Sequence, residues 1–234
     1  MTTSYPTKRH ILLGKRADMS LLDYHAYWSG PHTNEVIRVS GAQRYIQCHV
    51  SRMIWTATAQ MRQIAGFVEL DYGTPEAYQA VKAKMADRKA LLEDEARFLG
   101  WWSGSEAVGA PNRPIPSTRR IIGILFRPEG ADPAAFRARV QDFIEGFRGL
   151  CPCYAEEALT QDIREEPPLH AFEWPDFYLY FDPVRADELP LLTAEDGPLV
   201  AGLKALSAKG GAFLTRAEAK LMPEELDRDY WPEP

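Results

Sequence analysis

The chain is poor in three features that would each indicate a definite class of protein. It has only three cysteines, an odd number, which indicates reduced thiols and predicts a cytoplasmic protein. Its 234 residues carry a net charge of −6 and no run of basic residues, which argues against a nucleic-acid-binding surface. No apolar run approaches the roughly 18 residues of a membrane-spanning helix. Residues 1–6 also lack the apolar stretch of a secretory signal.

Several catalytic and cofactor motifs are missing as well. The sequence has no Walker or dinucleotide glycine pattern and no Gly-x-Ser-x-Gly of a serine hydrolase. It has no His-x-x-x-His, and Cys151-Pro152-Cys153 is spaced too tightly for a zinc knuckle. We therefore expect no metal site.

What is present is an ordinary globular composition, with 45% hydrophobic and 26% charged residues. In the first half, alternating segments predict four strands, and segments with helical spacing predict two helices. The strands are expected at residues 9–15, 42–52, 64–72 and 100–108, and the helices after Ser20 and at residues 75–99. The order β-α-β-β-α-β is that of the ferredoxin-like plan.

The same order recurs after a proline-rich segment at residues 109–116, which we interpret as a linker. Strands are expected at residues 120–127, 154–161, 171–181 and 212–219, and helices from Pro133 and at residues 191–208. The sequence thus predicts two tandem ferredoxin-like repeats of about 110 residues. Their predicted limits are residues 1–110 and 117–222, and an acidic, proline-rich tail follows at residues 223–234.

The expected fold is therefore α+β, with both repeats in one barrel. One ferredoxin-like unit covers one face of its sheet with two helices and leaves the other face bare. Two units in one chain are able to bury their bare faces against each other, which gives an intramolecular α/β-barrel. A cavity between sheet and helices then becomes possible, and a barrel of this size can hold one small ligand.

Residues 20–49 carry three of the five histidines. A capping signal at Ser20 predicts a helix on which Tyr24, Trp28 and His32 share one stripe. A purely structural stripe would carry aliphatic side chains, whereas this one carries rings with hydrogen-bonding groups. The stretch is therefore the first place to look for a site.

Gly30-Pro31 interrupts this helix, because proline cannot donate a backbone hydrogen bond. Two arrangements fit: the helix kinks, or it ends near Ser29 and a second segment begins with Pro31. In both, backbone groups near His32 are expected to be free to meet a ligand.

The second repeat has mostly hydrocarbon where the first has polar rings. It places Phe136 at the position of Tyr24, Arg139 at that of Tyr27, Val140 at that of Trp28 and Ile144 at that of His32. We therefore expect one functional pocket, in the N-terminal half.

Two motifs of the first half resemble a known family. They are Tyr24-x-x-Tyr27-Trp28-x-x-x-His32 and Arg44-Tyr45-Ile46-Gln47-x-His49-Val50. Together they resemble the EthD family of the dimeric α/β-barrel superfamily, best over residues 8–50 and more loosely to residue 108. The start of the first strand, residues 8–11, is also similar to that of plant olivetolic acid cyclase.

The resemblance implies a cavity lined by the first helix and the inner face of the sheet, with no metal or organic cofactor. Relatives in the superfamily dehydrate, cyclise or decarboxylate aromatic and polyketide-like substrates. Others are cofactor-free monooxygenases or act on haem or chlorite. The similarity to the plant cyclase implies that His10 faces the pocket.

His32 and His10 are the candidate catalytic residues, because histidine can both take and give a proton near neutral pH. The structural alternatives are a histidine that caps a helix end for His32 and a core histidine for His10. The candidate substrate-binding residues are Tyr24, Tyr27, Trp28, Tyr45, His49 and Trp102. For these aromatic residues, plain core packing is the alternative. Trp101 and Trp102 alternate along a strand, so at most one of them lines the pocket.

These observations predict a cofactor-independent lyase that acts on a small aromatic or polyketide-like substrate by histidine general acid–base catalysis. A cofactor-free monooxygenase and a non-catalytic binder of a hydrophobic metabolite or haem are the alternatives. The acidic tail favours a homodimer. No nucleic-acid or membrane partner is expected.

Overall fold

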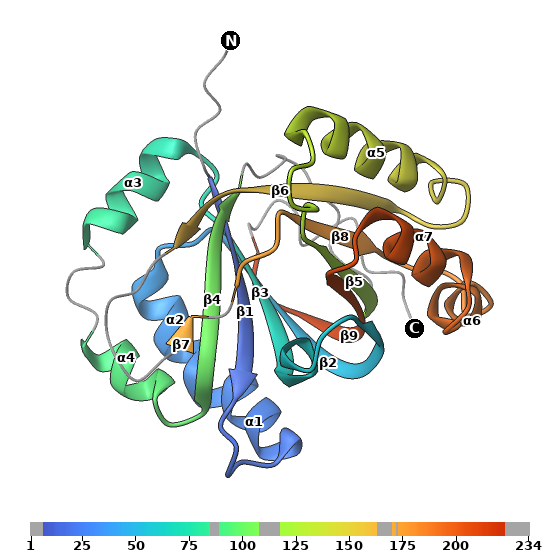
Figure 1. The fold of residues 1–234 in the computed structure, drawn as a ribbon. Coiled ribbons are helices and arrows are strands. Elements are labelled where there is room, and N and C mark those ends of the chain that lie inside the picture. Colours follow the sequence, from blue (N-terminus) through green and yellow to red (C-terminus); the bar gives the residue numbers. More distant parts are fainter. Residues whose placement is uncertain (1–6, 85–88, 108–117, 163–169, 172, 223–234) are drawn as a thin grey trace.

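Eight antiparallel strands close into a barrel whose outside is covered by two groups of helices (Figure 1). The computed structural model describes residues 7–84, 89–107, 118–162, 170–171 and 173–222. The predicted linker at residues 109–116 and the predicted tail at residues 223–234 lie outside the described residues. The barrel strands are β1 (Lys8–Lys15), β2 (Arg44–Thr56), β3 (Ile64–Asp71), β4 (Leu99–Ala107), β5 (Arg119–Leu125), β6 (Cys153–Asp162), β8 (Phe177–Phe181) and β9 (Gly210–Leu221).

The barrel consists of two four-stranded halves with the same strand order. The first half runs β4-β1-β3-β2 and the second runs β9-β5-β8-β6. They join at two seams, β2 with β9 and β4 with β6, and the two-residue strand β7 (His170–Ala171) adds to β4 in parallel. The predicted α+β fold with an eight-stranded barrel is confirmed. The origin of the second half by duplication, and the domain limits, stay predictions.

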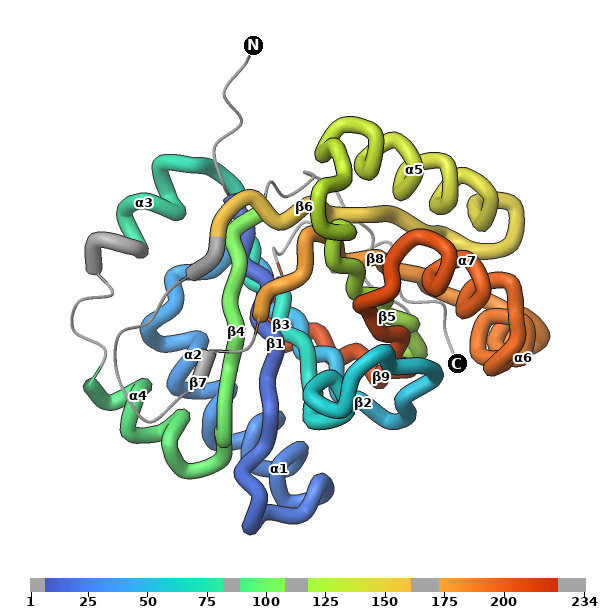
Figure 2. The backbone as a smooth tube through the Cα atoms, in the orientation of Figure 1, coloured from blue at the N-terminus to red at the C-terminus, as the bar shows by residue number. Residues whose placement is uncertain are grey.

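Each half carries its own helices on the outer face of the sheet, so that they lie on opposite sides of the barrel (Figure 2). The first half has α1 (Leu21–Tyr27), η1 (Trp28–His32), α2 (Thr33–Ser40), α3 (Pro75–Lys84) and α4 (Lys89–Glu95), and the second has α5 (Pro133–Glu145), α6 (Glu188–Thr193) and α7 (Pro198–Leu206). A short 3-10 turn, η2 (Gln60–Gln63), precedes β3. Two predicted long helices, at residues 75–99 and 191–208, are each divided into two shorter ones. None of the helices in the described part of the chain is long and apolar enough to span a membrane.

The predicted helix starts after Ser20 and at Pro133 are confirmed, and each helix has a side-chain cap. The Ser20 hydroxyl accepts from the Asp23 backbone N–H at 3.0 Å and donates to the Asp23 carboxylate at 2.7 Å. Asp132 likewise accepts from the backbone N–H of Ala135 at 2.7 Å. Each cap satisfies an N–H group that has no partner within its helix.

Pro31 distorts the first helix but does not end it. The chain continues from α1 into α2 through η1, a π-helical turn that contains the proline. Thr33 Oγ1 donates to the carbonyls of Trp28 at 2.9 Å and Ser29 at 3.0 Å, and Gln47 Nε2 donates to the Trp28 carbonyl at 3.0 Å. The prediction that backbone groups here are free for a ligand is therefore wrong for these two carbonyls.

The interior of the barrel is apolar except for a network of charges that spans both halves. Lys8 Nζ lies 2.6 Å from Glu69 and 3.0 Å from Glu156, and Arg120 binds Asp182 through two hydrogen bonds of 2.7 and 2.8 Å. Arg120 also pairs with Glu69. Burial acts to raise the pKa of Glu69, but Lys8 and Arg120 outweigh it and hold that pKa far below its usual range.

His10 belongs to this interior network. Its Nε2 lies 2.5 Å from Glu156, and its Nδ1 lies 2.9 Å from the Tyr180 hydroxyl. The imidazole stacks on Tyr178 with ring centroids 4.3 Å apart. Glu156 and both tyrosines come from the second half, so His10 helps to hold the two halves together.

Candidate active site

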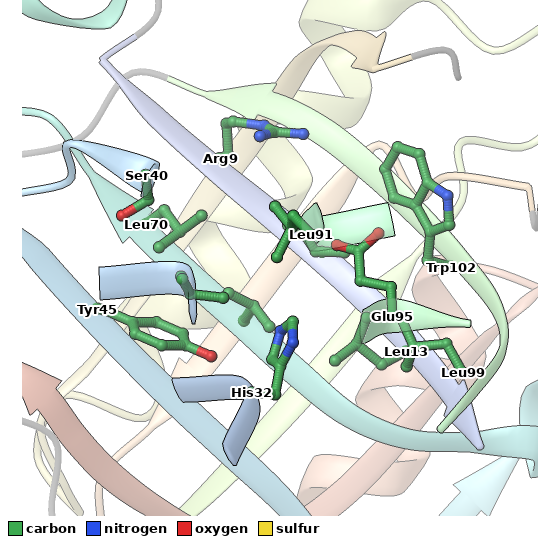
Figure 3. Close-up of a pocket in the computed structure, with 13 residues that line it drawn as sticks. Arg9, Leu13, His32, Ser40, Tyr45, Leu70, Leu91, Glu95, Leu99 and Trp102 are labelled. Carbon is green, nitrogen blue, oxygen red and sulfur yellow. The ribbon is translucent and has the colours of Figure 1, made fainter. Parts of the chain in front are cut away.

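A cavity of about 40 Å³ lies between the outer face of the first-half sheet and the helices η1, α2 and α4 (Figure 3). Its lining consists of Arg9, Ile11, Leu13, His32, Val36, Ser40, Tyr45, Val68, Leu70, Leu91, Glu95, Leu99 and Trp102. Every one of these residues belongs to the first half. In the second half, Phe136, Val140 and Ile144 are buried in an apolar cluster. The predicted asymmetry between the two halves is therefore present in the packing.

Strand alternation decides which side chains reach the cavity. On β1, Arg9, Ile11 and Leu13 face it, while His10 points into the barrel. On β4, Trp102 lines the cavity, and its neighbour Trp101 packs in the barrel core. The two tryptophans thus lie on opposite faces of β4, as the strand alternation predicts.

His32 is held by a carboxylate of α4. Its Nδ1 lies 2.7 Å from one oxygen of Asp94, and Tyr27 donates to the other oxygen at 2.5 Å. Burial acts to raise the pKa of Asp94, but the hydrogen bonds from His32 and Tyr27 outweigh it, and the pKa is lowered. An ionised Asp94 can only accept, so Nδ1 of His32 carries a hydrogen. Its Nε2 has no hydrogen-bond partner among the described residues.

Tyr45 approaches His32 from β2. Figure 3 shows its hydroxyl directed towards the imidazole across the cavity. The side chain is 1% exposed, and burial raises the pKa of its hydroxyl, helped by the charge of Glu95, while Gln47 and Trp28 act to lower it. The net shift is upwards, so the hydroxyl stays protonated and able to donate.

The family model of the EthD domain matches residues 16–100. This part of the chain is an EthD domain. No curated protein sequence matches the chain.

Two solved structures share the fold. One is a candidate monooxygenase from Fusobacterium nucleatum subsp. nucleatum ATCC 25586, with 11% sequence identity, a TM-score of 0.52 and coverage of 93% of this chain and 95% of the other. The second is an anthrone oxidase-like protein, with 6% identity, a TM-score of 0.55 and coverage of 95% and 96%. At this identity the likeness shows the dimeric α/β-barrel fold alone.

The EthD domain contributes nine of the thirteen residues that line the cavity. It also supplies Asp94 and Tyr27, which hold His32. The other four lining residues, Arg9, Ile11, Leu13 and Trp102, come from β1 and β4 on either side of the matched segment. The cavity is thus formed mainly by this domain.

Several candidate residues lie in the EthD domain but do not line the cavity. Tyr24 and Trp28 are fully buried in the apolar layer between α1 and the sheet, where the indole of Trp28 packs on Gly66. His49 is 1% exposed and its ring lies 4.4 Å from that of Trp28. The structure therefore brings His32, Tyr27, Tyr45 and Trp102 together around the cavity. Tyr24, Trp28 and His49 are buried outside it. The functional roles of all seven residues stay predictions.

Three charged residues of the site were not predicted from the sequence: Arg9, Asp94 and Glu95. All three are buried, and Arg9 and Glu95 line the cavity. The signal for the two acids is the helical spacing of Leu91, Asp94 and Glu95, which places both carboxylates on the buried stripe of α4. Within the part of the chain that the structure describes, no three His, Cys, Asp or Glu side chains are grouped to hold a metal ion.

Proposed function

We propose that the cavity is the active site of an enzyme that catalyses proton transfer on a small aromatic or polyketide-like ketone without a cofactor. The observation that carries this proposal is the pair of His32 and Tyr45. A histidine oriented by a carboxylate presents its unpaired Nε2 to an apolar cavity, opposite a hydroxyl that stays protonated. Such chemistry needs a base that takes the proton and an acid that stays protonated and donates.

In a dehydration, Nε2 of His32 takes the proton from the carbon next to the substrate carbonyl. Asp94 stabilises the imidazolium that forms, as the orienting carboxylate does in other histidine-based sites. Tyr45 donates a hydrogen bond to the carbonyl oxygen while negative charge builds on it. The imidazolium then returns the proton to the leaving hydroxyl, the C–O bond breaks and water departs. The same enolate would serve a decarboxylation or a cyclisation.

The partner of His32 in this proposal is Tyr45 rather than His10. His10 lies on the opposite face of β1 and is paired with Glu156 inside the barrel. A substrate in contact with His32 would have to pass through the sheet to reach it.

The lining favours a flat apolar substrate. Eight of the thirteen lining residues are aliphatic or Trp102. The cavity of about 40 Å³ holds a few water molecules, whereas a benzene ring occupies a cavity on the order of 150 Å³. A ring therefore enters only if side chains such as Leu91 and Trp102 change rotamer, so that binding is coupled to opening of the site.

The test is a dehydration assay with aromatic β-hydroxy ketones, in which the conjugated enone is followed by its absorbance. His32→Ala should lower turnover roughly 10²- to 10⁴-fold, the usual contribution of a general base, without loss of secondary structure by circular dichroism. Tyr72→Phe is the control, because Tyr72 is fully buried in the same layer but does not line the cavity. Turnover that survives His32→Ala unchanged removes this residue from the mechanism.

A cofactor-free monooxygenase is the second candidate. It is favoured by the two proteins of similar fold, described as a candidate monooxygenase and as anthrone oxidase-like. The same base would generate a carbanion, which then reacts with dissolved oxygen. Oxygen consumption in step with substrate loss, measured with an oxygen electrode, identifies the monooxygenase. Product formation without oxygen uptake identifies the lyase. A homodimer, as the acidic tail predicts, is tested by size-exclusion chromatography of the full chain.

A further inference from the structure

We propose that Gln47, which does not line the cavity, is a positioning residue that directs the hydroxyl hydrogen of Tyr45 into it. This inference rests on the proposed function, because it explains how the donor of the acid–base pair is kept in the right direction. It follows from three contacts whose donor and acceptor roles are fixed by chemistry.

The amide of Gln47 can be oriented in only one way. Its Nε2 lies 3.0 Å from the carbonyl oxygen of Trp28, and a carbonyl oxygen can only accept. The opposite orientation would bring two oxygens together in a fully buried place, since Gln47 is 0% exposed. The Trp28 carbonyl is within reach because the π-helical turn at Pro31 breaks the regular helical hydrogen-bond pattern.

The orientation of Gln47 determines that of Tyr45. The same Nε2 lies 2.6 Å from the Tyr45 hydroxyl oxygen and 3.0 Å from Thr33 Oγ1. One of its two hydrogens goes to the Trp28 carbonyl, and the second is directed at the nearer of these two oxygens, that of Tyr45. An amide nitrogen cannot accept, so the oxygen of Tyr45 accepts and its own hydrogen must point elsewhere. Among the described residues no acceptor for that hydrogen is present, and the cavity lies on that side of the ring. A substrate oxygen is therefore the acceptor that the site lacks.

A second set of contacts fixes the amide oxygen of Gln47. Nε2 of His49 lies 3.2 Å from the amide oxygen of Gln47, and 3.7 Å from the carboxylate of Glu218 on β9. Both of these oxygens accept, so the hydrogen of His49 belongs on Nε2. Burial lowers the pKa of His49 to about 3, so the ring is neutral near pH 7.

Glu218 is itself fixed in place. It accepts from Ser29 at 2.8 Å and lies 2.5 Å from the ammonium of Lys220. Because β9 belongs to the second half, the chain of contacts crosses the seam between β2 and β9. The second half of the chain thus helps to orient a donor in the first-half cavity.

The experiment uses two readouts that a purely structural role would not move together. In the protein without ligand, tyrosine labelled with ¹³C at the ζ carbon reports the hydrogen bonding of Tyr45, assigned by its loss in Tyr45→Phe. With acetophenone as probe, the infrared carbonyl stretch reports donation from the Tyr45 hydroxyl. Gln47→Met should move the ¹³C resonance, shift the carbonyl band towards its position in Tyr45→Phe and weaken acetophenone binding roughly three- to tenfold. Tyr72→Phe should change none of these.

A milder second variant keeps the test valid if Gln47→Met does not fold. Glu218→Gln alters a side chain at the seam that is about one quarter exposed, with 23% of its surface accessible, and should move both signals in the same direction by a smaller amount. A ¹³C resonance unmoved in both variants overturns the positioning role. So does a carbonyl band that shifts in Tyr45→Phe and is unchanged in Gln47→Met, although the proposed function would then survive. Failure of acetophenone to bind the wild-type cavity overturns the proposed function and this inference together.

Discussion

Arg120→Met tests whether the charges inside the barrel stabilise the fold as strongly as their burial implies. The guanidinium is 0% exposed and donates to Asp182 through Nε and Nη2, to Glu69 through Nη1, and to the Tyr154 hydroxyl at 2.9 Å. Methionine keeps much of the aliphatic volume but removes all of the donors. Asp182, 5% exposed, is then left without a cation, because no other side chain among the described residues binds its carboxylate.

Removing one partner of a buried ion pair costs about 3–5 kcal/mol. A typical domain has a free energy of unfolding of about 5–15 kcal/mol, so the variant should lose a large fraction of its stability. The double variant Arg120→Met/Asp182→Leu should recover most of that loss, because an apolar pair of similar volume carries no uncompensated charge. This recovery separates an electrostatic cost from a packing defect.

The assay is urea unfolding of the wild type and both variants at about pH 7 and about pH 4.5. In the wild type the pKa of Glu69 is depressed by its cations, so its contribution to stability is present above the unfolded pKa and is lost as the pH falls. Without Arg120 the Glu69 carboxylate protonates more readily in mild acid, so the deficit of Arg120→Met should shrink at the lower pH. A loss below about 1 kcal/mol at pH 7, or a deficit that does not change with pH, would refute the reasoning.

Three further predictions follow from single positions. Leu91→Ala should enlarge the cavity, lower the free energy of unfolding by about 2–5 kcal/mol and tighten acetophenone binding by calorimetry; weaker binding would mean that the ring enters elsewhere. In the wild type the pKa of His49 is lowered to about 3, so between about pH 6.5 and about pH 3 only the unfolded state binds a proton at this residue, and stability falls with the pH. In His49→Gln the free energy of unfolding should therefore fall less over that range. Urea midpoints with the same pH slope as the wild type would contradict this. Gly66→Ala should cost roughly 1–3 kcal/mol, since an added Cβ would lie 2.3 Å from the indole of Trp28, and an unchanged melting temperature would show that the indole moves away freely.

The parts of the fold that depend on local chemistry could be predicted from the sequence. The helix starts at Ser20 and Asp132 are set by side-chain caps within three residues, and both are observed. The alternation along β2 correctly places Tyr45 and His49 on the same side of the sheet, because side chains on a strand alternate with a period of two. Such signals need no knowledge of tertiary structure.

The parts that depend on which face lies inside could not be predicted. Both faces of the first-half sheet are buried, one by helices and one by the second half. The alternation of Arg9 and His10 therefore shows that they point to opposite sides but not which side holds the cavity. His10 was expected in the pocket through the similarity to a plant cyclase, and the structure places it inside the barrel.

Asp94 and Glu95 were missed for a related reason. The sequence predicts one helix over residues 75–99, with Leu92 among its buried apolar residues. On α4, however, Leu91, Asp94 and Glu95 are buried and Leu92 is only half-buried. Acidic residues are rarely buried without a partner. In this protein Asp94 has that partner in His32.

The two seams of the barrel have a consequence for how the chain could be divided. If the chain were cut between β4 and β5, each fragment would expose two strand edges. Backbone groups at an open edge bind another strand readily. The N-terminal fragment would carry Lys8 and the C-terminal fragment Glu156, so the ion pair between them could form only when the fragments meet. Co-expressed as separate polypeptides, the pieces should reassemble by complementation, and a reporter split at this point would measure how strongly the seams hold.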